Sequence, residues 1–493
     1  MEHDMYMETA ISAVAGELVS RFISFLMNKC YSSNECLEGK VERLQNALMR
    51  VHTVVEEADA RYITNSGMLV QLKKLSEAMY RGYHVLDTYK FGLHKESSMK
   101  MVSDSSALSS ATPLKRPRTI IASERSKVLS REIHDMLESL ETIIINMKEF
   151  VVFLGGCERI SPKPYDAYLY IDNFMFGRHT EKQKLLEFLL HHNQPGAVLP
   201  IIGGLAVGKK TLVTHVCGDE RVRSCFSSIL QLNGDNFMEF PYNHERTISG
   251  TILVVIEFVS DVNEEDWKKF HSFVTGMSKG SKVIIISTLE RLVRFGSVKP
   301  IFLNNLSYEE FWYLFKILAF GSANTLEHPQ LVPIAEEFCK ELHLGGSLVA
   351  ANAFADVLRS NLNAQFWLCI LNRCRRVIEK NISIYGEHPK LRFKQGYQVD
   401  ITDFKLHSAS PIHIIPCTSS SSTTSVRLEK ELPKITLREL IVEPAVKPNG
   451  DFNLLTWESR IPPYTSFVHF IPHCPLVPQV TPLSGRKRQG VTF

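Results

Sequence analysis

The sequence predicts a multidomain protein of class α plus α/β, and three observations indicate this class. Apolar stripes at helical spacing fill the first third of the chain. A short apolar run in the middle third ends in a glycine-containing loop followed by lysine. Further short apolar runs alternate there with helical segments, which is typical of a parallel sheet. At 493 residues the chain is also too long for one hydrophobic core.

We expect four parts. Residues 1–155 are predicted to form a four-helix bundle, with a flexible, Ser-rich loop at about 95–126. Residues 156–305 are predicted to form a P-loop domain with a doubly wound parallel sheet, and 306–380 a small helical subdomain. Residues 381–493 are rich in Pro and Ser and are predicted to be a largely irregular, partly disordered tail.

The four predicted bundle helices share one property, an apolar residue every three or four positions. Such a stripe must be buried against another element. The stripes are Ile11, Val14, Leu18, Phe22 and Phe25; Leu37, Val41, Leu44, Leu48, Val51, Val55 and Ala58; Leu72, Leu75, Met79 and Leu86; and Leu129, Ile133, Met136, Leu140, Ile144, Met147 and Val151.

Composition excludes several classes of function. The net charge of +3 is too small to predict a specific nucleic-acid partner. Ten cysteines without CxxC spacing favour neither a disulfide framework nor a zinc site. Glu17 and Arg21 interrupt the apolar start, and no run reaches the ~18 apolar residues of a membrane span, so we expect a cytoplasmic or nuclear protein. The run 115–118 (KRPR) is either a nuclear-import patch or a solvated charge run.

The strongest functional motif is the loop from Gly203 to Lys209, which fits G-x-x-x-x-G-K. In such loops the glycines let backbone N–H groups wrap a phosphate at a helix N-terminus, and Lys209 would reach the terminal phosphates. Thr211 and Leu212 continue the same helix. A strand-to-helix turn that binds nothing is the alternative interpretation of this motif alone.

The expected metal contact is altered. The residue after Lys209 is normally Ser or Thr, whose hydroxyl binds magnesium, but here it is Lys210, which has no lone pair to donate. Glu257, at the end of a second apolar run, is the candidate metal ligand, and Phe258 follows where hydrolysing proteins often carry a second acid. Nucleotide binding therefore remains the expectation, whereas magnesium binding is doubtful.

Five motifs follow one another along the chain: 176–178 (FGR), 203–213 (GGLAVGKKTLV), 217–222 (CGDERV), 280–288 (GSKVIIIST) and 306–321 (LSYEEFWYLFKILAFG). Together with the N-terminal helices, over Glu8 to Arg376, they resemble the coiled-coil NLR class of plant disease-resistance proteins, in which an Rx-type helical domain precedes an NB-ARC domain. The resemblance implies ADP or ATP as ligand, with the backbone of Phe176, Gly177 and Arg178 at the adenine. It also implies partners of NLR or signalling type, or self-association, through the bundle.

Departures from the family pattern weaken the case for catalysis. Leu289 stands where an arginine senses the terminal phosphate, and Ser347 replaces the proline that packs on the adenine side. The acidic motif of the third bundle helix is reduced to Asp87, and neither a winged-helix motif nor leucine-rich repeats follow. The candidate binding residues are Phe176, Gly177, Arg178, Gly203, Gly208, Lys209, Lys210, Thr211, Leu212 and Ser347, with Glu257 as a weak metal candidate.

Three functions follow from these residues. The first is a plant-defence protein that binds ADP or ATP as a regulatory or structural ligand. The second is an active ATPase, which the missing metal, water-orienting and charge-stabilising groups disfavour. The third is a nucleotide-free scaffold, decoy or helper of complete receptors. In the tail, the aromatic residues Trp457, Tyr464, Phe467 and Phe470 indicate either a docking segment or a patch covering the core.

Overall fold

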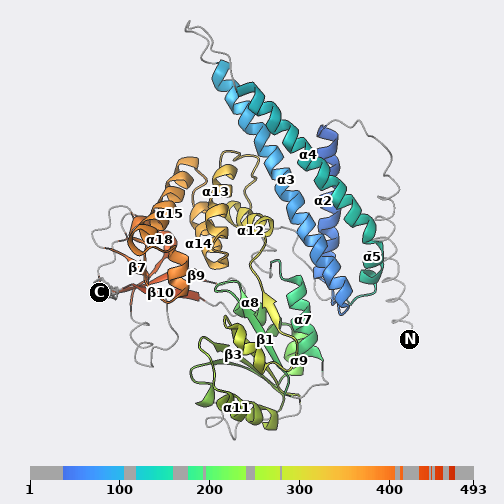
Figure 1. Ribbon diagram of the computed structural model, residues 1–493, viewed down its shortest axis with the longest axis vertical. Coiled ribbons are helices and arrows are strands. Elements are labelled where there is room, and N and C mark those ends of the chain that lie inside the picture. The colour runs from blue at the N-terminus through green and yellow to red at the C-terminus, as the bar shows by residue number, and fades with distance from the viewer. Residues whose placement is uncertain are drawn as a thin grey trace, which may run out of the picture. The chain divides into compact units, whose positions relative to one another are not determined.

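The fold is that of the computed structural model shown in Figure 1. The chain divides into two compact units, residues 1–372 with 456–467, and residues 373–455 with 468–493. No helix in the described part of the chain is long and apolar enough to cross a membrane. The described residues are 37–104, 118–158, 176–191, 196–239, 250–277, 280–405, 411–414, 432–443, 446, 450–458 and 466–471.

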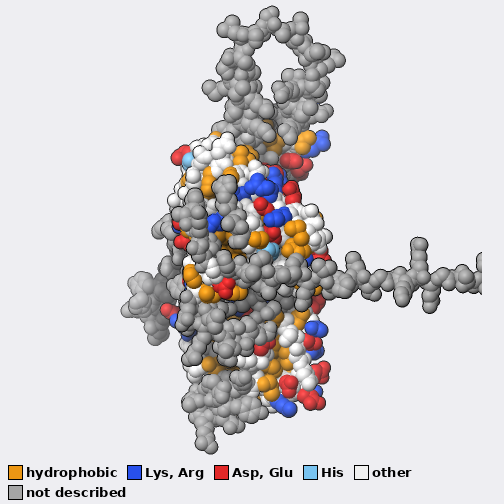
Figure 2. All heavy atoms as spheres, turned by 90° about the vertical axis from the view of Figure 1, so that its left-hand side faces the viewer, with side chains coloured by type: hydrophobic (Ala, Val, Ile, Leu, Met, Phe, Trp, Pro, Cys, Tyr) orange, Lys and Arg blue, Asp and Glu red, His pale blue; other side chains and the backbone are white. Residues whose placement is uncertain are grey.

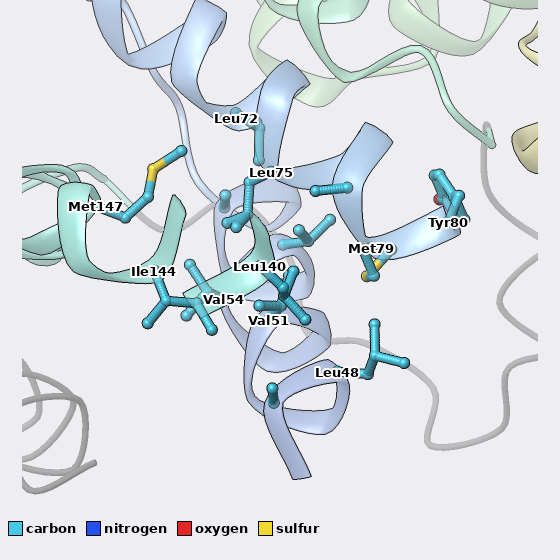
Figure 3. Close-up of a cluster of buried hydrophobic side chains, with 14 of the residues drawn as sticks. Leu48, Val51, Val54, Leu72, Leu75, Met79, Tyr80, Leu140, Ile144 and Met147 are labelled. Atoms are coloured by element: carbon cyan, nitrogen blue, oxygen red, sulfur yellow. The ribbon is translucent and has the colours of Figure 1, made fainter. Parts of the chain in front are cut away.

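The N-terminal helices of the first unit form a bundle, as predicted. They are α2 (Leu37–Asp59), α3 (Ser66–Asp104), α4 (Arg118–Asn146) and the short α5 (Lys148–Gly155). Side chains from three helices meet in its core (Figure 3), for example Leu48, Leu75 and Leu140. Every residue of the three predicted stripes within 37–151 is buried in this core or packs against it. The stripe from Ile11 to Phe25 lies outside the described residues.

The loop predicted at about 95–126 is shorter than expected. Helix α3 continues to Asp104 and α4 already begins at Arg118. The polar composition of these stretches indicated a loop, but it includes good helix formers such as Lys, Glu and Met, and a helix satisfies its own backbone without burying an apolar face. Residues 105–117, with most of the basic run 115–118, lie outside the described residues.

A five-stranded parallel sheet forms the centre of the middle region of the chain, with strand order β2-β3-β4-β1-β5. Successive residues face opposite layers: Ile284 packs with the α7–α9 side, whereas Val283 and Ile285 pack with the α11 side. The predicted doubly wound sheet is thus confirmed. Its elements are α7 (His179–Leu190), β1 (Val198–Gly203), α8 (Lys209–Cys217), α9 (Glu220–Cys225), β2 (Ser228–Asn233), η1 (Phe237–Glu239), β3 (Ile252–Phe258), α11 (Glu264–Met277), β4 (Lys282–Ser287), η2 (Glu290–Phe295) and β5 (Ile301–Leu303).

A helical segment follows the sheet. Ser307 caps α12 (Tyr308–Phe320) through a capping box with Glu310, because each side chain accepts a backbone N–H of the other residue. Helices α13 (Val332–His343) and α14 (Leu348–Arg359) follow, and then α15 (Ala364–Tyr385). The helical character predicted for 306–380 is therefore present.

The tail, predicted to be largely irregular, contains several short helices and strands. Leu454 in β9 and Ile471 in β10 are buried, as expected for runs rich in aromatic and β-branched residues. The rings of Trp457 and Phe467 lie with their centroids 5.9 Å apart and their planes inclined at 52°, while Tyr464 lies outside the described residues. The strands β8, β9 and β10 form a sheet of order β10-β9-β8. The elements are α16 (Pro389–Lys394), β6 (Val399–Asp400), η3 (Thr402–Phe404), β7 (His413–Ile414), β8 (Lys434–Thr436), α18 (Leu437–Val442), β9 (Phe452–Glu458) and β10 (Ser466–Ile471).

Candidate functional site

The loop between β1 and α8 has a shape that needs glycine at two of the predicted positions. Gly208 has φ +91°, a conformation that residues with a Cβ rarely adopt. At Gly203, a Cβ would lie 2.5 Å from the carbonyl oxygen of Leu303 in the neighbouring strand β5. Ala206 also adopts a positive φ of 57°, although it carries a Cβ. The loop is therefore a tightly constrained turn, as expected of a phosphate-binding loop.

Lys209 begins α8 and folds back over this loop. Its Nζ donates to the carbonyl oxygens of Gly203 at 2.9 Å and Gly204 at 2.6 Å. The side chain is only 9% exposed, and burial lowers the pKa of Lys209 to about 8, with Glu257 opposing and Lys210 adding to this shift. Because an ammonium has three protons, one donor remains for a ligand oxygen. Lys209 is thus held at the loop with one hydrogen bond to offer.

Lys210 takes a different role from the Ser or Thr expected at its position. Its Nζ forms an ion pair with Oε2 of Glu257, the residue before the last of β3. The candidate metal ligand is therefore occupied by an ammonium group. Among the described residues, no group of three or more His, Cys, Asp or Glu side chains is arranged to hold a metal ion.

Thr211 and Leu212, which follow Lys210 on α8, have distinct environments. Thr211 is partly exposed on α8. Leu212 is fully buried in the core between α8 and the sheet, so its side chain anchors the helix. Its backbone N–H donates to the carbonyl of Gly208. Of these two predicted residues, only Thr211 has a side chain that a ligand could reach.

Arg178 ties the segment before α7 to the loop. Its Nη2 donates to the carbonyl oxygens of Val207 at 3.2 Å and Asn304 at 2.7 Å, and the side chain is buried. Its Nε is buried without a hydrogen-bond partner, and burial lowers the pKa of Arg178. Gly177 beside it has φ +66°. The predicted residue Arg178 therefore supports the phosphate loop through backbone carbonyls.

The start of α14 lies against the same loop. Ser347 caps this helix by accepting the N–H of Ala350, and the next residue, Leu348, donates its N–H to the carbonyl of Ala206 at 3.1 Å. Ser347 is thus brought next to the loop. The sequence did not single out Leu348 or Asn304, since backbone hydrogen bonds leave no signal in side-chain type.

Phe176 points away from the loop, toward the bundle. Its ring lies 5.3 Å from that of Tyr80 in α3 and stacks on Tyr313 of α12 at 6.0 Å. Three residues later, Nδ1 of His179 lies 2.6 Å from Oδ1 of Asp59 in α2. The short segment 176–179 therefore contacts both the bundle and, through Arg178, the phosphate loop.

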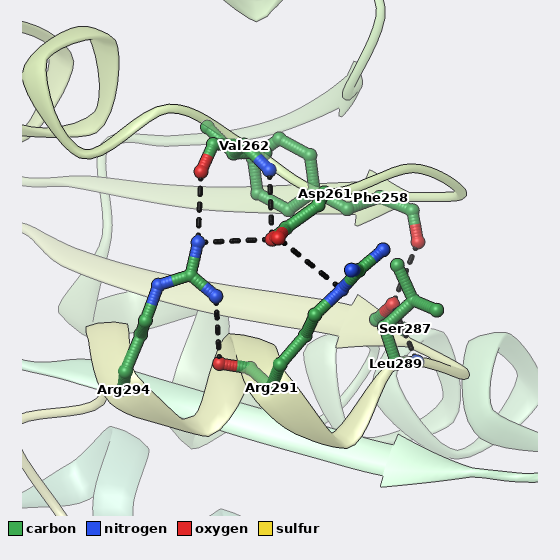
Figure 4. Close-up of polar contacts among 7 residues, drawn as sticks. All are labelled: Phe258, Asp261, Val262, Ser287, Leu289, Arg291 and Arg294. Carbon is green, nitrogen blue, oxygen red and sulfur yellow. Dashed lines mark hydrogen bonds and ion pairs between the residues drawn. The ribbon is translucent and has the colours of Figure 1, made fainter.

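Apolar side chains lie at the carboxyl edge of β3 and β4, at the two positions where the family pattern has an acid and an arginine. Phe258 is buried, with its ring 5.2 Å from that of Phe237, and Leu289 packs against the same core. Figure 4 shows the arginines that follow, Arg291 and Arg294, both paired with Asp261 at 3.2 and 2.9 Å.

Charge is mixed over the visible surface. On the face shown in Figure 2, Lys and Arg side chains lie interspersed with Asp and Glu side chains. The formal net charge of +3 agrees with this mixture. The described part of this face therefore gives no support for a nucleic-acid interface, which would need a continuous basic stripe.

Several known proteins are similar to this chain. Residues 14–115 match the family described as the Rx N-terminal domain. The chain is 22% identical over 364 residues to the disease resistance protein RGA2 of Solanum bulbocastanum, covering 67% of this chain and 35% of that protein. It is 24% identical over 359 residues to the putative disease resistance protein RGA1 of the same species, with the same coverage.

A relative from another species gives a similar result. The putative disease resistance RPP13-like protein 1 of Arabidopsis thaliana is 22% identical over 409 residues, covering 75% of this chain and 37% of that protein. The chain thus spans little more than a third of the length of these relatives. Domain III of the Thermotoga maritima replication initiation protein DnaA aligns at 16% identity over 46% of this chain and 93% of that one, but its TM-score of 0.24 is too low to support an argument.

Proposed function

We propose that this chain, which is similar to plant disease-resistance proteins, acts in defence as a binding protein for ADP or ATP. One observation carries the nucleotide proposal: Lys209 is held at a glycine-constrained turn with one N–H of its ammonium left to donate. Backbone amides at the start of α8 and this ammonium supply the electrostatics that phosphate binding needs.

The proposed ligand site consists of the loop Gly203–Lys209 and the segments that touch it. Arg178 supports the loop from one side, and the start of α14 at Ser347 closes against it from another. Gly177 and Phe176 lead into this support, and their backbone is the proposed neighbour of the adenine. Thr211 lies one residue beyond Lys210 on α8. We propose binding without turnover, because Phe258 and Leu289 occupy the positions of the missing catalytic groups.

The test is isothermal titration of the purified full-length protein with ADP, together with mass spectrometry of any nucleotide released on denaturation. We expect saturable ADP binding that Lys209→Ala abolishes. Lys268→Ala, which removes an exposed lysine of α11, is the matched control and should bind ADP normally. Absence of binding heat and of a thermal shift at millimolar ADP would exclude the proposal.

A second candidate is a nucleotide-free scaffold for complete receptors. It is favoured because both lysines of the site already have partners within the protein. Lys209 donates to loop carbonyls, and Lys210 pairs with Glu257. A folded protein that carries and binds no nucleotide, yet retains partner binding, would support this function over the first.

We also propose that the bundle engages another resistance-type or signalling protein, including a second copy of this chain. Support comes from the match to the Rx N-terminal domain and from the exposed apolar residues Val152 and Phe153 of α5, which are 55% and 59% exposed. Light scattering of the full chain should show self-association that Phe153→Ser weakens. The control Val259→Ser makes the same kind of apolar-to-polar change at another exposed position and should leave self-association unchanged.

A further inference from the structure

The position after Lys209 contains a cation where phosphate-binding loops normally place a metal-binding hydroxyl. Lys210 directs its Nζ to Oε2 of Glu257, the carboxylate that would otherwise hold the metal. Both side chains remain accessible, at 51% and 36% exposure, so the pair lies at the surface of the site and not in the core. A ligand arriving at the loop would therefore meet this ion pair directly.

Magnesium does not fit these residues. It demands near-octahedral oxygen coordination, and replacing the hydroxyl by an ammonium removes one oxygen ligand. The remaining candidate, Glu257, is already neutralised by Lys210. A magnesium ion would have to enter beside the ammonium groups of Lys209 and Lys210, which repel it. The surface ion pair is weak in itself, so the missing hydroxyl and the like charges are what exclude the metal.

We infer that the ammonium of Lys210 provides the positive charge that magnesium provides in other phosphate-binding loops, so that a nucleoside diphosphate binds in its metal-free form. Glu257 is then a positioning residue that keeps the Lys210 ammonium at the mouth of the loop. This inference rests on the proposed nucleotide binding, and it adds that this binding does not depend on magnesium. In solution magnesium competes for ADP, so excess magnesium should leave the apparent affinity equal or lower.

The exchange of one side chain should reverse this dependence. Lys210→Thr restores a hydroxyl and frees Glu257, which recreates the ligand set for magnesium. We expect this variant to bind ADP at least about tenfold more tightly with magnesium than with EDTA, since losing even an outer-shell partner of a metal ligand typically costs about 10–100-fold in metal affinity. Lys210→Ala, which lacks both cation and hydroxyl, should bind more weakly than the wild type in EDTA and should not recover with magnesium.

The experiment is isothermal titration of the full-length wild type, Lys210→Thr and Lys210→Ala with ADP, each in excess EDTA and in excess magnesium. Thermal melting verifies that each variant is folded. Lys268→Thr is the matched control, because Lys268 also forms a surface ion pair, with Glu264 on α11. This variant should behave as the wild type in both buffers.

The outcomes separate the inference from the function on which it rests. Wild-type binding that is equal or weaker with magnesium, together with magnesium-dependent binding by Lys210→Thr, supports the inference. Wild-type binding that requires or gains from magnesium overturns it while leaving nucleotide binding intact. Failure of the wild type to bind ADP in either buffer overturns the proposed function, and the inference with it.

Discussion

Asp87 of α3 forms an ion pair with Lys316 of α12, a residue 229 positions later in the chain, and the same carboxylate oxygen accepts the indole N–H of Trp312 at 3.1 Å. Both charged side chains are largely buried, at 16% and 13% exposure, so water compensates little for the loss of either. The acid that remains in the reduced motif of the third bundle helix therefore joins the bundle to the helical subdomain.

Asp87→Ala should weaken this junction. It leaves the Trp312 and Lys316 donors without their acceptor, at a cost of about 1–3 kcal/mol. We expect faster amide hydrogen exchange in α12 of the full-length protein. Asp87→Asn, which retains a carbonyl acceptor, should show a smaller effect, and Glu132→Ala at an exposed position of α4 should show none. Unchanged exchange in α12 of Asp87→Ala would show that this contact does not hold the two elements together.

ADP affinity should fall at alkaline pH. Burial lowers the pKa of Lys209 to about 8, so in the free protein the ammonium is lost as the pH rises through that value. A diphosphate favours the protonated form, and binding above the pKa must therefore take up a proton. Linkage predicts a loss of up to about tenfold in affinity between about pH 7 and about pH 9.

The phosphates of ADP do not explain such a loss, because their last proton leaves near a pKa of about 6. Lys268→Ala, the exposed control, should show the same decline as the wild type. Titration calorimetry across this range measures the effect directly. An affinity that stays constant would mean that Lys209 does not contact the phosphates.

Gly203→Ala should destabilise the domain built on the parallel sheet. The added Cβ would lie 2.5 Å from the Leu303 carbonyl oxygen, a backbone atom that moves only with strand β5. We expect a loss of about 1–3 kcal/mol, typical of overpacking, seen as a lower melting temperature. Gly276→Ala in α11 is the matched control, since its Cβ meets nothing within 4 Å. That change should stabilise by up to about 1 kcal/mol through helix propensity. Equal melting temperatures would contradict the strain at Gly203.

The bundle and the sheet could be predicted because their signals are local. Each stripe in α2, α3 and α4 repeats within one helix. Ile284 and Ile285 are buried on opposite faces of the sheet, as the two-residue period of a strand requires. The same period explains Phe258: the sequence marked it as a missing acid, while the structure places it in the core beside Phe237.

The partners within the site could not be predicted, because they join residues far apart in sequence. Lys210 and Glu257 are brought together by the parallel register of β3, β4 and β1. The sequence shows that Lys210 stands where a hydroxyl is usual. Only the fold shows that its ammonium pairs with Glu257, the carboxylate that would otherwise hold the metal. The contact between the ring of Phe176 and Tyr80 of the bundle could likewise not be predicted, because the two residues lie far apart in the sequence.

Arg178 gives the last prediction, because it supports the phosphate loop without a charged partner among its hydrogen bonds. Its Nη2 spans the carbonyls of Val207 and Asn304, so Arg178→Met leaves both acceptors unpaired near the loop. We expect a lower melting temperature and an ADP affinity reduced about tenfold, which corresponds to about 1.4 kcal/mol. Arg178→Lys keeps one donor and should lose less on both measures. Arg291→Lys, at an arginine that is 58% exposed, is the control and should match the wild type. If Arg178→Met lowered the melting temperature alone and bound ADP normally, the loop would hold its shape without this guanidinium.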